Sequence, residues 1–144
     1  MNERFIIIGI WILLGLGVVF AAGIFIATVN PYGTQGGRAS YRTIGTGTTE
    51  QGDVSVELTP QGVRGGQFIF DLAVNTHSVD LTAVNLYAAA TLEYNGKTVK
   101  PSRAPELQGH HASGTIAFPV SGSPSRFTVT IQGIANQNIR TYRW

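Results

Sequence analysis

The sequence predicts an all-β domain preceded by one N-terminal transmembrane helix. We expect a sandwich of about seven antiparallel strands, of immunoglobulin-like or fibronectin-like type, with a closed barrel as the alternative. Three observations support this prediction. From residue 53 onward, short runs alternate apolar and polar side chains, which is typical of strands with one buried face. Turn residues separate these runs at roughly ten-residue intervals. No amphipathic helical pattern competes with them in this region.

The transmembrane helix is predicted at residues 5–29. These 25 residues are strongly apolar and include no charged residue. A helix needs about 20 apolar residues to cross the hydrocarbon core of a bilayer. A cleaved signal peptide is the alternative, but its apolar core would be shorter and an Ala-x-Ala-like site would follow. We therefore expect a membrane anchor that is retained in the mature protein.

Charge and turn residues define the segments around this helix. Residues 1–4 form a short stub that includes Arg4, and the next basic residue after the helix is Arg38. The positive-inside rule then predicts a cytoplasmic N-terminus and an extracytoplasmic C-terminal domain in the cell membrane. Pro31 ends the helix, because proline disfavours helical geometry in the residue before it. Residues 30–52 are rich in Gly and Thr and are predicted to be a tether.

The β domain is predicted to span residues 53–144. The Asn95-Gly96 pair is the strongest hairpin signal in this region, because both residues tolerate the positive φ angles of a type I′ turn. The predicted strands are 53–60, 68–74, 84–94, 97–100, 115–118, 126–131 and 139–144.

The three histidines are the candidate metal ligands. His77 follows the second predicted strand, whereas His110 and His111 precede the fifth. If successive strands alternate in direction, both loops lie at one end of the domain, which is also the end where the tether would enter. Neutral imidazoles suit copper or zinc, and Asp80 could add an oxygen ligand. The alternative is that these histidines fix loops by hydrogen bonding or contact a partner.

Three motifs resemble those of a group of largely uncharacterised bacterial exported β-sandwich domains. They are Asn75-Thr76-His77-Ser78 followed by Asp80-Leu81, then Gly109-His110-His111 followed by Ser113-Gly114, and last Arg140 followed by Tyr142-Arg143-Trp144. The resemblance covers about half of the region after the tether. It implies an exported sandwich domain and assigns no activity. The resemblance implies Arg at the position where this chain has Ala112, so the chain departs from the pattern of the group in this loop.

Signals for other chemistry are weak. The Gly- and Thr-rich run at 45–49 lacks the lysine and the following helix of a phosphate-binding loop. Ser78 and Ser113 lie near histidines, but neither has the glycine-flanked motif of a hydrolase nucleophile. The chain has no Cys, and its net charge is only +2. Arg140 and Arg143 are therefore expected on an ordinary solvated surface, with anionic lipid or an acidic patch of a partner as alternative contacts.

We therefore expect a non-catalytic, single-pass accessory subunit of a larger membrane complex. Its partners would be the lipid bilayer and integral membrane proteins, with no nucleic acid, small-molecule substrate or cofactor. Only 12% of the residues are charged, about half the usual share, so a partner would cover part of the surface. The alternative function is a tethered copper-binding or copper-delivery domain that uses His77, His110 and His111. Carbohydrate binding or adhesion is a third class, for which Tyr87, Tyr94 and Tyr142 are the candidate aromatic contacts.

Overall fold

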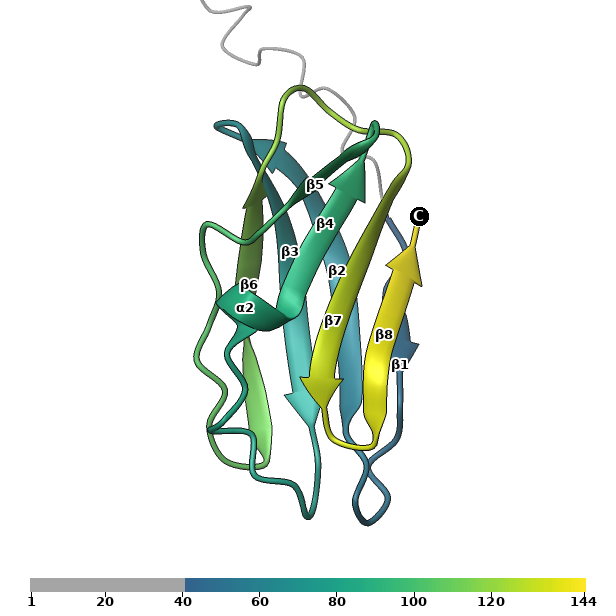
Figure 1. The fold of residues 1–144 in the computed structure, drawn as a ribbon, viewed down its shortest axis with the longest axis vertical. Coiled ribbons are helices and arrows are strands. Elements are labelled where there is room, and N and C mark those ends of the chain that lie inside the picture. Colours follow the sequence, from purple (N-terminus) through teal and green to yellow (C-terminus); the bar gives the residue numbers. More distant parts are fainter. Residues whose placement is uncertain (1–40) are drawn as a thin grey trace, which may run out of the picture. The chain divides into compact units, whose positions relative to one another are not determined.

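The computed structural model describes residues 41–144, which form two antiparallel four-stranded sheets (Figure 1). The predicted transmembrane helix at 5–29 lies outside the described residues. Within residues 41–144, no helix has the length and apolar character needed to cross a membrane. The predicted all-β, two-sheet architecture is confirmed, and the strands form two separate sheets rather than a single closed one.

Each sheet combines strands from distant parts of the sequence. The first has the order β1-β2-β3-β6, in which the strands are β1 (Ile44–Thr46), β2 (Ser55–Arg64), β3 (Gln67–Asn75) and β6 (His111–Pro119). The second has the order β5-β4-β7-β8, in which the strands are β4 (Ala90–Tyr94), β5 (Lys97–Val99), β7 (Phe127–Ile134) and β8 (Gln137–Arg143). The seven predicted runs overlap with β2 to β8, and β1 was not predicted.

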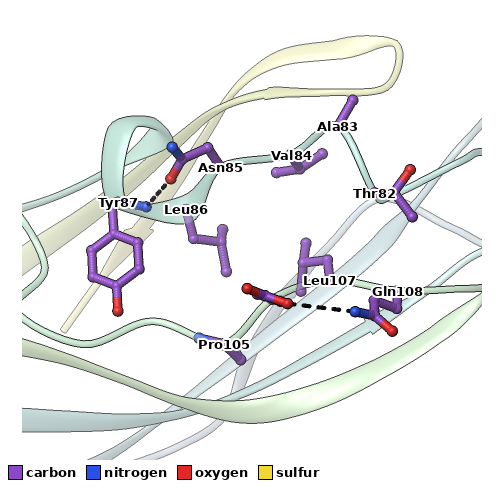
Figure 2. Close-up of a pocket in the computed structure, with 10 residues that line it drawn as sticks. Thr82, Ala83, Val84, Asn85, Leu86, Tyr87, Pro105, Leu107 and Gln108 are labelled. Atoms are coloured by element: carbon purple, nitrogen blue, oxygen red, sulfur yellow. Dashed lines mark hydrogen bonds between the residues drawn. The ribbon is translucent and has the colours of Figure 1, made fainter.

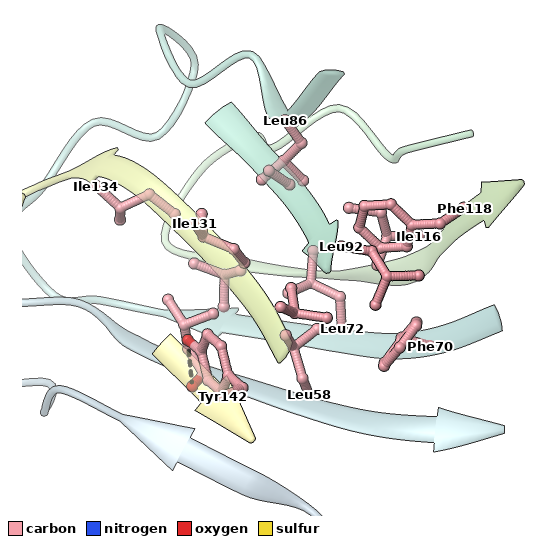
Figure 3. Close-up of a cluster of buried hydrophobic side chains, with 14 of the residues drawn as sticks. Leu58, Phe70, Leu72, Leu86, Leu92, Ile116, Phe118, Ile131, Ile134 and Tyr142 are labelled. Atoms are coloured by element: carbon pink, nitrogen blue, oxygen red, sulfur yellow. Dashed lines mark hydrogen bonds between the residues drawn. The ribbon is translucent and has the colours of Figure 1, made fainter. Parts of the chain in front are cut away.

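The hydrophobic core lies between the two sheets (Figure 3). Alternate side chains of β2, β3, β4 and most of β7 point into it, as the period-two pattern predicted. Full burial of each Leu, Ile or Phe side chain contributes about 1.5–3 kcal/mol. Fully buried examples from both sheets are Leu58, Phe70, Ile116, Phe118, Leu92 and Ile131.

The Asn95-Gly96 turn joins β4 to β5 as predicted. Asn95 has a φ of 46° and Gly96 a φ of 73°, so both central residues have the positive φ of a type I′ turn. This turn fixes the β4–β5 register, in which Tyr94 pairs with Lys97.

The predicted strand at 84–94 is wrong in its first half. Leu86–Ala89 form a short helix, α2, and only Ala90–Tyr94 form strand β4. Leucine and alanine are strong helix formers, and Asn85 caps the helix by accepting a hydrogen bond from the Tyr87 N–H at 3.0 Å. The helix changes the chain direction before β4 joins the second sheet.

The predicted tether at 30–52 is also wrong in its last third. Ile44–Thr46 pair with β2 as strand β1, with Ile44 opposite Leu58. Tyr41 packs against Phe127, with ring centroids 5.4 Å apart, and against Phe68 at 6.1 Å. A three-residue strand is too short to give a periodic signal, because its position depends on contacts with distant residues. The folded domain therefore begins before residue 53.

Candidate functional site

Two of the three histidines that were predicted as metal ligands lie close together at one end of the first sheet. Asn75 and His111 are paired residues on β3 and β6, and His77 follows β3 by two residues. The ring centroids of His77 and His111 are 6.5 Å apart, and both side chains are exposed. This agrees with the predicted placement of the two histidine-containing segments at the same end of the domain.

The expectation that the tether enters at this end is wrong. Tyr41 contacts Phe68, at the start of β3, whereas His111 pairs with Asn75 at the end of β3. The unpredicted strand β1 explains the difference. It carries the chain from the Phe68 end of the sheet to the histidine end before β2 begins.

Buried Thr76 fastens the two histidine segments to each other and to the start of β2. Its backbone N–H donates to the His110 carbonyl at 2.9 Å, and its hydroxyl donates to the Asp53 carbonyl at 2.9 Å. The hydroxyl oxygen also accepts from the N–H groups of Ser78 and Val79, at 3.3 and 3.2 Å. The Asn-Thr-His-Ser motif therefore has a structural role as a side-chain-stabilised turn.

Asn75 fixes the orientation of His111. The Oδ1 atom of Asn75 lies 2.9 Å from the Nδ1 atom of His111. An amide oxygen only accepts hydrogen bonds, so Nδ1 carries the proton and donates it. The Nε2 atom of His111 then keeps a free lone pair that can bind a metal ion.

His110 does not join the other two histidines in a three-ligand group. Among residues 41–144, no group of three or more His, Cys, Asp or Glu side chains could hold a metal ion together. The carboxylate of Asp80 is hydrogen-bonded within its own loop, since its Oδ1 accepts from the Thr82 hydroxyl at 2.7 Å and from the Thr82 N–H at 2.9 Å. These two hydrogen bonds lower the pKa of Asp80, with a smaller contribution from the charge of His110. The predicted three-histidine set is thus reduced to a pair.

A buried arginine, which was predicted on the surface, holds the same end of the domain together. The side chain of Arg140 on β8 is fully buried and lies 3.5 Å from Asp53 Oδ1. Its Nη1 donates to the Thr46 carbonyl at 3.1 Å, and its Nη2 donates to the Ile134 carbonyl at 3.4 Å. The alternation in β8 puts Arg140 on the same face as Tyr142, but the partners that make its burial favourable come from other parts of the chain.

Asp53 is the anionic partner of this arginine. Its pKa is lowered mainly by the hydrogen bond from the Val54 N–H, then by that from the Thr48 N–H, with a smaller effect from Arg140. Its hydrogen bonds hold the loop that connects β1 to β2. Asp53 and Arg140 therefore serve the fold at this end of the domain.

The C-terminal Tyr-Arg-Trp motif also serves the fold. The Tyr142 hydroxyl lies 2.7 Å from Thr46 Oγ1 and donates to the Val56 carbonyl at 3.3 Å, and burial raises the pKa of this phenol. Trp144 stacks on Phe127 at 5.3 Å and donates from Nε1 to the Arg42 carbonyl at 2.8 Å. The motif thus fixes residues 42–46 to the second sheet.

A pocket of about 350 Å³ lies beside helix α2 (Figure 2). Leu86, Pro105 and Leu107 supply apolar lining, and Tyr87 stands at its edge with 49% of its surface exposed. Of the three tyrosines considered for carbohydrate contact, Tyr94 and Tyr142 are buried. The aromatic platform expected for that function is therefore reduced to one residue.

Comparison with known proteins gives no relative from which to transfer a function. No family model matches the chain, and no curated protein or solved structure matches it either.

Proposed function

We propose that the chain is a single-pass membrane protein and a non-catalytic accessory subunit of a larger membrane complex. The observation that carries the proposal is the uncharged, apolar run of 25 residues at 5–29, upstream of a compact β domain. Such a run is long enough to cross a bilayer as a helix. The N-terminus would be cytoplasmic and the sandwich extracytoplasmic.

The outer face of the second sheet supports docking on a partner protein. Thr91, Thr130 and Thr141 are paired in one row across β4, β7 and β8. On one side, the next pair on the same face is Gln132 with Ile139, and Ile139 is 63% exposed. We call the five uncharged residues of these two rows the threonine face. On the other side the next row is charged, since Thr128 pairs with Glu93 and with Arg143. Depletion of charge is characteristic of the central part of protein interfaces.

The occupant of this face would be an integral membrane protein of the same complex. A membrane anchor would confine the sandwich to the surface of the bilayer, where the exposed parts of such proteins are its neighbours.

The strand order supports the immunoglobulin-like or fibronectin-like type of sandwich, because β2-β3-β6 and β5-β4-β7-β8 are linked by crossovers between the two sheets.

Co-purification from native membranes tests the proposal. We expect the full chain, extracted in mild detergent, to elute with other membrane proteins and to cross-link to them. Thr130→Lys, which places a charge in the threonine face, should reduce recovery of the complex. Thr115→Lys is the matched control on the outer face of the first sheet and should leave recovery unchanged.

Two results would contradict the proposal. One is a chain that fractionates with soluble proteins, which would exclude the anchor. The other is a lone monomer in every mild detergent, which would exclude the complex. Equal losses for Thr130→Lys and Thr115→Lys would exclude the threonine face as the docking surface.

A further inference from the structure

His77 and His111 form a pair of neighbouring imidazoles at one end of the first sheet. The β3–β6 register brings the two residues to one end of the sheet, with ring centroids 6.5 Å apart. Two imidazoles that share one ion have centroids no more than about 6 Å apart, because metal–nitrogen bonds are about 2 Å long. The observed separation is slightly larger than this limit, so the proposal requires that the exposed His77 side chain moves toward His111 when the ion binds.

The surroundings of both rings favour ligation. The Nδ1 atom of His111 is bonded to Asn75 Oδ1, which leaves Nε2 free. Metal-binding histidines almost always have such a partner on the other ring nitrogen, because it fixes the ring orientation. The segment carrying His77 is also fixed in place, since Ser78 Oγ accepts from the Gly52 N–H at 2.7 Å and Thr76 N–H donates to the His110 carbonyl.

We propose that His77 and His111 form a two-imidazole site, open to solvent, that binds a Cu(II) ion. Imidazole nitrogens suit copper, zinc, iron and nickel, and among divalent ions of this series Cu(II) binds a given nitrogen site most tightly. With two protein ligands, the remaining coordination positions are filled by water or by a small ligand. Asn75 is a positioning residue in this site, because it acts through His111. The proposal is independent of the membrane complex.

Cu(II) titration of the full chain in mild detergent tests the proposal, with a purification tag that contains no histidine. We expect one Cu(II) ion per chain, and an electron paramagnetic resonance spectrum with coupling to nitrogen. His77→Ala and His111→Ala should each weaken binding at least about 100-fold, which corresponds to the loss of one of only two protein ligands. His110→Ala is the matched control and should change the affinity less than about twofold, because His110 is outside the pair.

Asn75 gives a second, independent readout. Asn75→Ala should weaken binding about 10-fold to 100-fold and change the copper spectrum. Asn75→Asp keeps an oxygen acceptor for His111 Nδ1, so its Cu(II) affinity and copper spectrum should be those of the unchanged chain. Circular dichroism of each variant checks that the domain is still folded. We expect the histidine variants to remain folded, because their side chains are exposed.

Several results would overturn the assignment. They are no binding tighter than micromolar, equal losses for His110→Ala and His111→Ala, or an Asn75→Asp variant that behaves like Asn75→Ala. Tighter binding of Zn(II) than of Cu(II) would overturn the choice of metal.

Discussion

Gly47 is the position where the fold should be most sensitive to one added methyl group. It follows β1 and has a φ of +75°, which L-residues rarely adopt. A Cβ atom at this position would lie 2.1 Å from the Val54 carbonyl oxygen and 2.5 Å from Arg140 Nη1. Gly65 is the matched control, because its φ is +57° and a Cβ atom there meets nothing within 4 Å.

The expected cost of Gly47→Ala has three parts. The left-handed backbone costs about 1–2 kcal/mol in Gly47→Ala and in Gly65→Ala alike. At Gly47 the contact with a backbone carbonyl, which cannot rotate away, adds about 1–3 kcal/mol as overpacking. Displacing Arg140 Nη1 from Thr46 adds about 1.5–3 kcal/mol for a lost charged hydrogen bond. We therefore expect Gly47→Ala to lower the free energy of unfolding by about 3.5–8 kcal/mol, and Gly65→Ala by about 1–2 kcal/mol.

Urea unfolding of the full chain in mild detergent measures this difference. The chain has two tryptophans, Trp11 and Trp144, so a Trp11→Phe background makes Trp144 the reporter of the folded domain. Trp144 stacks on Phe127, so its fluorescence should change on unfolding. If Gly47→Ala and Gly65→Ala destabilise the domain equally, the close approach of Gly47 to Arg140 is refuted.

Three further outcomes follow from the hydrogen bonds at the same end of the domain. Tyr142→Phe removes the hydroxyl that bonds to β1 and β2 and should cost about 1–2 kcal/mol in urea unfolding. Thr76→Val leaves buried backbone groups without a partner and should cost about 1–3 kcal/mol in the same assay, whereas no loss would refute its anchoring role. The pKa of Asp53 is lowered in the folded state, chiefly by the N–H groups of Val54 and Thr48, so its contribution to stability is present above about pH 4 and lost as the pH falls. Asp53→Asn should therefore flatten the acid side of the stability profile, and an unchanged profile would contradict the bonding pattern.

The strands of the sandwich could be predicted because their burial pattern is local. Strands β2, β3, β4 and β7 bury alternate side chains against the other sheet along most of their length, so the sequence itself carries a period of two. The Asn95-Gly96 turn is equally local, since both residues adopt positive φ without help from the rest of the fold. The meeting of His77 and His111 followed from strand direction alone.

The parts that could not be predicted depend on long-range contacts. Strand β1 has three residues, and its place is set by Tyr142 and Arg140, which lie more than 90 residues away. Arg140 resembled a surface residue because arginine is rarely buried without partners. Its partners, the Thr46 and Ile134 carbonyls and Asp53, are visible only in the folded chain. Helix α2 was missed because four residues are too few for a helical period.

The start of the domain offers the sharpest test of these long-range contacts. The sequence predicts a boundary at residue 53, whereas Tyr41, Arg42 and Thr46 contact the second sheet. A chain that begins at Tyr41 should unfold cooperatively. One that begins at Asp53 keeps Asp53 and the Ile134 carbonyl beside Arg140 but removes the Thr46 oxygens, and a lost hydrogen bond to a charged group costs about 1.5–3 kcal/mol. It also removes strand β1 and the contacts of Tyr41 and Arg42, whereas the whole stability of a small domain is only about 5–15 kcal/mol. We therefore expect the chain from Asp53 to be unfolded or aggregated. Matched unfolding midpoints for the two chains would show that residues 41–52 contribute nothing to stability.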